Sequence, residues 1–227
     1  MGKHWWIVLI FAAALVVPRS ANAQVSVWLQ NGVSGLGAEA GVSADDSSTT
    51  VHVAGGYSHL GQLDFDVGLN YTTFNNDNAI ASDLGAYGAT VAVQYHPLKQ
   101  GPDMPISLAL QLGVPFGMLT SQQLDDAGIS GTLWGIAGGV AAYRFIKIAP
   151  NVGVTPSIGL LYTYSHITLK NDMDEQVTSS DGQIGLNLTG NFGFLASNGA
   201  IYGISPSLFL GDNVSYSLTV GIIWTLH

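Results

Sequence analysis

The feature that most constrains this chain is an alternation of apolar with polar or small residues, which recurs along most of its length. In the last segment, Tyr216, Leu218, Val220 and Ile222 alternate with serine, threonine and glycine. Successive side chains of a strand point to opposite faces, so this period of two predicts β-strands with one apolar and one polar face.

Ten segments alternate in this way, at residues 33–43, 50–59, 62–73, 84–96, 105–116, 132–145, 152–169, 183–195, 200–211 and 215–227. Most exceed the roughly 5–6 residues typical of soluble strands and are long enough to cross a bilayer at a tilt. Lipid admits β-structure only as a closed barrel, because unpaired backbone groups are costly in hydrocarbon. We therefore predict an all-β fold, a closed antiparallel up-and-down transmembrane β-barrel of ten strands, with eight as the alternative if segments merge.

The connections between these segments supply a second test. Those after the first, third, fifth and seventh strands are long and polar, at Ala44–Thr49, Asn75–Asp83, Thr120–Gly131 and Lys170–Gly182, whereas the one after the ninth, Asp212–Val214, is short. Long connections outside and mostly shorter ones inside are typical of barrels with both termini in the periplasm. Val25, Val27 and Leu29 are out of phase with the first strand, so Asn31-Gly32 is either a bulge or a turn after a separate periplasmic segment.

The N-terminus has the pattern of a secretory signal peptide. Lys3 precedes an apolar run from Trp5 to Val17, and Ala21-Asn22-Ala23 supplies a small-x-small cleavage pattern. The apolar run is too short to cross a bilayer as a helix. We expect residues 1–23 to be removed and residues 24–227 to form the barrel.

Composition excludes several classes of protein. Charged residues make up 9% of the chain, the formal net charge is −9, and cysteine is absent. Nucleic-acid surfaces need clustered positive charge, so we expect no nucleic-acid partner. The glycines at Gly135, Gly138 and Gly139 lie inside a strand pattern and do not form a phosphate loop. We expect no cofactor.

With its signal peptide, repeated amphipathic strands and final strand Tyr216–His227, the chain resembles small bacterial outer-membrane β-barrel proteins of the porin-like superfamily. The resemblance implies location in the bacterial outer membrane, with membrane lipid, lipopolysaccharide and the barrel assembly machinery as partners. That machinery usually reads a terminal aromatic residue, whereas this chain ends in His227. Trp224 is the candidate substitute.

Charged and polar residues on the inward face define a candidate site in the lumen. We assign to a lumen charge network Glu39, His52, Asp64, Asp66, His96 and Arg144. If the sixth strand turns Arg144 inward, it lies near the periplasmic end of the lumen together with Asp64, Asp66 and His96. Such a network is either a structural ion-pair plug or a constriction that filters solutes. Both alternatives remain open.

The outer connections suggest a metal site and the apolar face suggests a membrane-interface belt. Divalent cations prefer carboxylate oxygens, so Asp172, Asp174 and Glu175 are candidates to bridge a cation to lipopolysaccharide, with a solvated acidic rim as the alternative. We assign an aromatic girdle at the lipid boundary to Tyr162, Tyr164, Trp224 and Tyr216.

For function, we expect a non-enzymatic barrel, a narrow porin-like channel or passive carrier for small solutes. A structural or adhesion barrel with acidic loops is the alternative, and a lipid-modifying enzyme is a third. Ser165 and His166 form the one tempting catalytic pair, but adjacent strand residues point to opposite faces and cannot easily share a proton.

Overall fold

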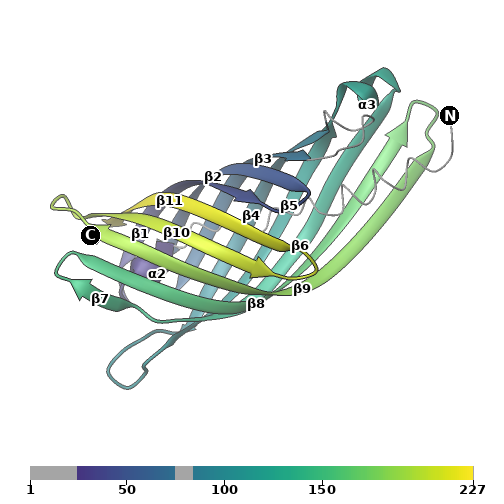
Figure 1. The fold of residues 1–227 in the computed structure, drawn as a ribbon. Helices are drawn as coiled ribbons and strands as arrows, with labels where there is room; N and C mark the ends of the chain where they lie inside the picture. The colour runs from purple at the N-terminus through teal and green to yellow at the C-terminus, as the bar shows by residue number, and fades with distance from the viewer. Residues whose placement is uncertain (1–24, 75–83, 227) are drawn as a thin grey trace.

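The structure, a computed structural model, describes residues 25–74 and 84–226 and is dominated by β-strands (Figure 1). The expected signal peptide, the expected connection Asn75–Asp83 and His227 lie outside the described residues. The described helices are α2 (Val25–Trp28) and α3 (Gln122–Asp126). The described strands are β1 (Ser34–Ala44), β2 (Ser48–His59), β3 (Leu63–Phe74), β4 (Gly85–Leu98), β5 (Ser107–Thr120), β6 (Ile129–Tyr143), β7 (Ile146–Ala149), β8 (Val152–Asn171), β9 (Gln176–Leu195), β10 (Ala200–Leu210) and β11 (Val214–Leu226).

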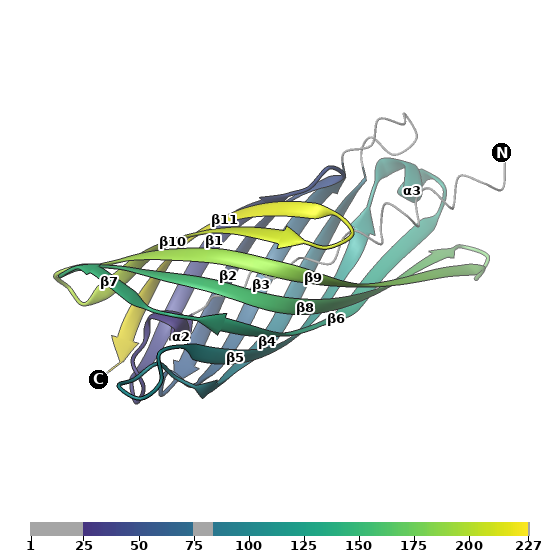
Figure 2. The same cartoon turned by 60° about the horizontal axis from the view of Figure 1, so that its bottom comes forward.

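The strands form one antiparallel sheet that closes on itself. Neighbours run in sequence order from β1 to β6 on one side, and β1 pairs with β11, which is followed by β10, β9 and β8. Pairing of β6 with β8 closes the barrel (Figure 2). The short β7 pairs with the start of β8 and continues the line of β6 after a break at Arg144 and Phe145. The described wall therefore has ten strands, which confirms the predicted barrel and excludes the eight-stranded alternative.

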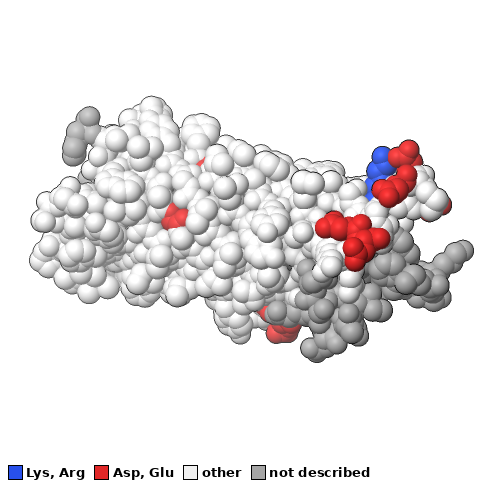
Figure 3. Space-filling view, turned by 90° about the horizontal axis from the view of Figure 1, so that it is seen from above, with Lys and Arg blue, Asp and Glu red and all other residues white. Residues whose placement is uncertain are grey.

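The wall of the barrel is apolar outside and polar or small inside. On β3, Phe65, Val67 and Leu69 are 48%, 58% and 60% exposed. Asp64 and Asp66, which alternate with them, are 0% and 3% exposed. In Figure 3 the middle of the visible face is almost free of charge, and most charged atoms gather at one end. This arrangement suits a hydrocarbon surrounding, in which the backbone is satisfied within a closed sheet.

The two ends of the barrel differ. We call the end that holds Ser34 and Leu226 the short-turn end and the opposite end the long-loop end. At the long-loop end the hairpin of β8 and β9, here called the β8–β9 ribbon, extends past β10, because β9 pairs with β10 only as far as Leu186. On its other side β8 pairs with β6 as far as Asn171. The expected loop Lys170–Gly182 is therefore wrong, since β9 already begins at Gln176.

An apolar cluster lies inside the long-loop end, beneath α3. Ser121 caps this helix by accepting a hydrogen bond from the Gln123 backbone N–H at 3.2 Å. Leu124 of α3 is buried in a cluster with inward side chains of β3, β6 and β8, including Phe74, Leu133 and Ile167. The cluster makes this part of the lumen apolar.

At the short-turn end, the chain before β1 enters the lumen instead of joining the wall (Figure 1). Val27 packs with Ala109 and Tyr143, and Leu29 packs with Ala54 and Ile223. The chain then turns at Asn31-Gly32, where Gly32 has a φ of 88° that favours glycine. The turn, rather than the bulge, is therefore the correct interpretation of Asn31-Gly32. No helix in the described ranges is long and apolar enough to cross a bilayer.

Candidate functional site

The polar part of the lumen lies between the apolar cluster and α2. Along β3 the inward side chains run from Phe74 in the cluster, through Thr72 and Asp66, to Asp64 near the short-turn end. Five of the six residues predicted for the charge network point inward and are buried or partly buried, namely Glu39, His52, Asp64, Asp66 and His96.

Arg144 is the exception and corrects the prediction. It lies between Tyr143, which is buried inside the barrel, and Phe145, whose ring contacts Trp28 in the lumen. Because side chains alternate, Arg144 points the other way, and its side chain is exposed. Its backbone N–H donates to the Pro156 carbonyl at 3.2 Å. The sixth strand does not turn Arg144 inward, so it is not a member of the lumen network.

Asp64, His96 and Tyr143 form a buried chain of polar contacts. His96 Nε2 lies 3.5 Å from Asp64 Oδ2, with both side chains fully buried. The Tyr143 hydroxyl lies 2.7 Å from His96 Nδ1, and the two rings meet edge to face. Asp64 lies opposite Gln94 in the β3–β4 register, which brings His96 within reach two residues further along. Such a chain of partners rigidifies the wall where a lone buried charge would be costly.

Lys99 lies just beyond β4 and connects this chain to α2. Its ammonium donates to the Leu29 carbonyl at 3.3 Å and lies 5.7 Å from the centre of the Tyr143 ring. Burial lowers the Lys99 pKa from 10.5 to about 8, although the nearby Asp64 carboxylate acts in the opposite direction. Lys99 and Tyr143 were not predicted as members of the network. The inward parity of Tyr143 on the sixth strand was the available signal.

Asp66 and Glu39 differ from Asp64 in their surroundings. Asp66 is 3% exposed, and neither carboxylate oxygen has a hydrogen-bond partner among the described residues. Glu39 Oε1 is likewise buried without such a partner. The Asp66 carboxylate lies over Gly56, where a Cβ would overlap its Oδ1. Glu39 and Asp64 are both close enough to act on Asp66 electrostatically.

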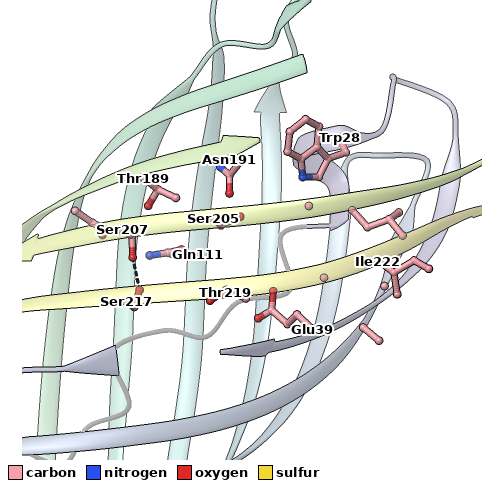
Figure 4. Close-up of a pocket in the computed structure, with 16 residues that line it drawn as sticks. Trp28, Glu39, Gln111, Thr189, Asn191, Ser205, Ser207, Ser217, Thr219 and Ile222 are labelled. Atoms are coloured by element: carbon pink, nitrogen blue, oxygen red, sulfur yellow. Dashed lines mark hydrogen bonds between the residues drawn. The ribbon is translucent and has the colours of Figure 1, made fainter. Parts of the chain in front are cut away.

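The opposite side of the lumen is a wall of hydroxyl and amide groups. A cavity of about 70 Å³ lies between Trp28 of α2, Glu39 of β1 and this wall (Figure 4). Ser207 and Ser217 hydrogen-bond to each other across β10 and β11. The other labelled polar side chains of the wall are Gln111, Thr189, Asn191, Ser205 and Thr219. The cavity therefore has one acidic side and one neutral, hydrogen-bonding side.

The acidic turn between β8 and β9 holds the three carboxylates of the expected metal site in separate contacts. Asp174 pairs with Lys170 at 2.6 Å, and Glu175 Oε2 accepts from the Asn171 amide at 3.0 Å. Asp172 lies instead against Gly128, in the connection before β6. Across the described residues, no three His, Cys, Asp or Glu side chains come together in a group that could hold a metal ion. Two of the three predicted carboxylates are thus engaged by Lys170 and Asn171, and a cation bridged from Asp172, Asp174 and Glu175 to lipopolysaccharide stays a prediction.

The predicted girdle residues lie on the outer face of the wall. Tyr162, Trp224 and Tyr216 are 47%, 45% and 64% exposed, and Tyr164 is partly exposed against Trp134, with ring centres 5.8 Å apart. These positions suit a membrane interface. The girdle itself remains a prediction.

His166 and Ser165 point to opposite faces, as the alternation requires. Ser165 is buried inside, whereas His166 is partly exposed outside and stacks near Trp134, with ring centres 5.4 Å apart. His166 Nδ1 instead lies 2.8 Å from Ser180 Oγ on the neighbouring β9, and Nε2 lies 3.4 Å from the Thr168 hydroxyl. The imidazole thus faces two hydroxyl groups in these contacts.

Comparison with known proteins places the fold. No protein-family model matches the sequence, and no curated protein matches it. Among solved structures, the chain resembles the β-domain of the Bordetella autotransporter BrkA, with 11% identity, a TM-score of 0.53, and coverage of 87% of this chain and 100% of the other. It also resembles the translocator domain of the autotransporter NalP from Neisseria meningitidis, with 11% identity, a TM-score of 0.50, and coverage of 87% and 89%. At such identities the likeness shows the fold alone. The chain has the fold of the bacterial outer-membrane β-barrels.

Proposed function

We propose that this protein is an outer-membrane barrel that acts as a narrow channel or passive carrier for small solutes, and that it is not an enzyme. The observation that carries the proposal is the cavity in the lumen, lined on one side by small hydroxyl and amide groups and on the other by Glu39. Such a lining offers hydrogen bonds to a solute that has lost part of its water, without covalent chemistry.

In this proposal the short-turn end faces the periplasm and the long-loop end faces outward, as in other barrels with both termini inside. Lipid and lipopolysaccharide surround the wall, and the barrel assembly machinery inserts it. The α2 segment then lies in the periplasmic half of the lumen, where its contact with Lys99 restricts the passage. Solute flow is therefore slow and limited to small molecules.

Liposome swelling tests the proposal directly. Vesicles that contain the refolded protein should admit amino acids and small sugars in order of size, and vesicles without it should not. In planar bilayers, Asp64→Asn and Asp66→Asn should reduce the preference for cations, since these are carboxylates of the lumen. A folded barrel that gives neither swelling nor conductance would contradict the proposal.

One observation favours a structural or adhesion barrel as the second candidate. The β8–β9 ribbon extends past the end of β10, so residues 176–185 of β9 pair with β8 alone. A free strand edge outside a membrane can add a strand from a partner. If deletion of this ribbon abolishes attachment of cells to a surface or host matrix while the barrel stays impermeable, the second candidate replaces the first.

The contact between His166 and Ser180 makes an enzyme worth testing. A serine nucleophile needs a base within hydrogen-bond reach and a third group that orients the base. Here His166 would be the base for Ser180, and the group on its other ring nitrogen is the Thr168 hydroxyl instead of a carboxylate. Overexpression should leave the lipid A profile unchanged in mass spectra. A change that disappears with His166→Ala or Ser180→Ala would show that the protein modifies lipid.

A further inference from the structure

We infer that the lumen holds a binding site for a small protonated amine, with the Glu39 and Asp66 carboxylates as its anionic side. This inference deepens the proposed function, on which it rests, by naming the class of solute. In the described part of the lumen, buried carboxyl oxygens of Glu39 and Asp66 have no hydrogen-bond donor.

Asp66 supplies the first argument. Its side chain is 3% exposed, and both carboxylate oxygens lack a hydrogen-bond partner among the described residues. A buried carboxylate without donors is costly, and a cationic ligand with N–H groups removes that cost. Because a Cβ at Gly56 would overlap Asp66 Oδ1, the missing side chain at Gly56 is what lets the carboxylate lie over β2 on the Glu39 side.

Glu39 supplies the second argument, because it lines the cavity itself. Its Oε1 is buried without a hydrogen-bond partner among the described residues, and the neutral wall begins on the neighbouring β11 with Thr219 and continues over β10 and β9 (Figure 4). Lys99, the cation nearest to the network, is directed to Asp64 and to the Leu29 carbonyl at 3.3 Å. On the Glu39–Asp66 side of the lumen, two neighbouring carboxyl groups therefore have oxygens with no hydrogen-bond partner among the described residues, and Glu39 is the one that lines the cavity.

The chemistry of the lining favours an amine over a metal ion. Ca²⁺ binds six to eight oxygen ligands, and Mg²⁺ binds six. The described residues contain no group of three or more His, Cys, Asp or Glu side chains that could hold a metal ion. An ammonium group has three donors, which can reach a carboxylate and neutral oxygens such as those of Asn191 and Thr219. The volume of about 70 Å³ limits the ligand to a few non-hydrogen atoms.

The experiment is a calorimetric titration of the full refolded chain in detergent micelles with methylammonium chloride, at constant ionic strength. Potassium and magnesium chlorides are titrated in parallel. Variants are Glu39→Gln and Asp66→Asn, with Asp212→Asn as the matched control, because it removes one negative charge from an exposed residue outside the strands. Folding of each variant is checked by the mobility difference between heated and unheated samples on gels.

We expect saturable methylammonium binding that weakens about 10-fold or more in Glu39→Gln and in Asp66→Asn, as expected for loss of a charged hydrogen-bond partner. Asp212→Asn should bind like the unchanged protein, and both metal cations should bind more weakly. Absence of saturable binding by the folded protein, equal binding by Glu39→Gln, or equal affinity for potassium would each overturn the inference. The titration needs no transport, so a barrel that conducts without binding methylammonium refutes this site alone, and one that binds without conducting refutes the channel alone.

Discussion

Replacement of Trp28 by alanine should release α2 from the lumen without unfolding the barrel. The Trp28 ring lies where a Cβ on Gly193 would stand and meets Phe145 edge to face, with ring centres 6.2 Å apart. Removal of a fully buried aromatic side chain costs about 3–5 kcal/mol. Trp28 is half-buried, so we expect a loss of about 2 kcal/mol in the docking of the segment.

A loss of that size raises the fraction of molecules with α2 undocked by about 30-fold. Local opening of this kind is measured by hydrogen exchange, in which amides of residues 25–30 should exchange faster by the same factor while strand amides do not change. Conductance in planar bilayers should rise in parallel. Trp134→Ala is the matched control, because Trp134 is 44% exposed on the outer face.

Unchanged exchange in residues 25–30 would refute the reasoning, since it would mean that Trp28 does not hold the segment. Faster exchange over all strands would also refute it, because the residue would then support the barrel itself. Faster exchange in α2 with unchanged conductance would leave the docking correct and show that α2 does not limit the flow.

Three further predictions concern the wall and the network. Stability toward urea should rise between about pH 8 and pH 10.5. The reason is that the Lys99 pKa is about 8 in the folded protein and 10.5 ordinarily, so the unfolded chain binds more protons in that window. The variant Lys99→Met should flatten this pH dependence. Val67→Arg, at a position 58% exposed on the outer face, should destabilise the barrel by about 2–4 kcal/mol if it lies near the bilayer midplane, and Thr73→Arg near the end of the same strand by at most about 1 kcal/mol. Tyr143→Phe removes the partner of His96 Nδ1 and should lower stability by about 1–3 kcal/mol in the same assay, whereas Tyr87→Phe on the outer face, where Tyr87 is 61% exposed, should change little.

The alternation of apolar and polar residues predicted the fold because it shows, for each strand, which face meets lipid and which face meets the lumen. On β3, Asp64 and Asp66 alternate with Phe65 and Val67, which already places charge on the face that cannot meet lipid. The inward positions of the predicted lumen residues follow from the same parity. The inward position predicted for Arg144 was wrong because the strand breaks after β6. This break accompanies the pairing of β7 with β8, which the alternation around Arg144 does not show.

Other parts of the structure depend on contacts that a linear pattern cannot show. Val27 and Leu29 alternate as in a strand, yet α2 is a short helix because partners inside the barrel, such as Tyr143, bury them. Beyond the bilayer neither face of a strand needs to be apolar, so the first residues of β9 have no period to detect. The link between Lys99 and Leu29 joins residues 70 positions apart and becomes visible only in the folded chain.

The pair Gly55-Gly56 has a consequence for which sequence changes the protein tolerates. A methyl group on Gly55 would meet only the Gly37 carbonyl oxygen at an ordinary 3.6 Å, whereas one on Gly56 would push against Asp66. Alanine at position 55 is therefore neutral for the lumen, whereas alanine at position 56 displaces the Asp66 carboxylate and also meets the Phe65 backbone oxygen at 3.3 Å. One methyl group at Gly56, a residue with no functional side chain, is therefore enough to move the Asp66 carboxylate from its place in the lumen.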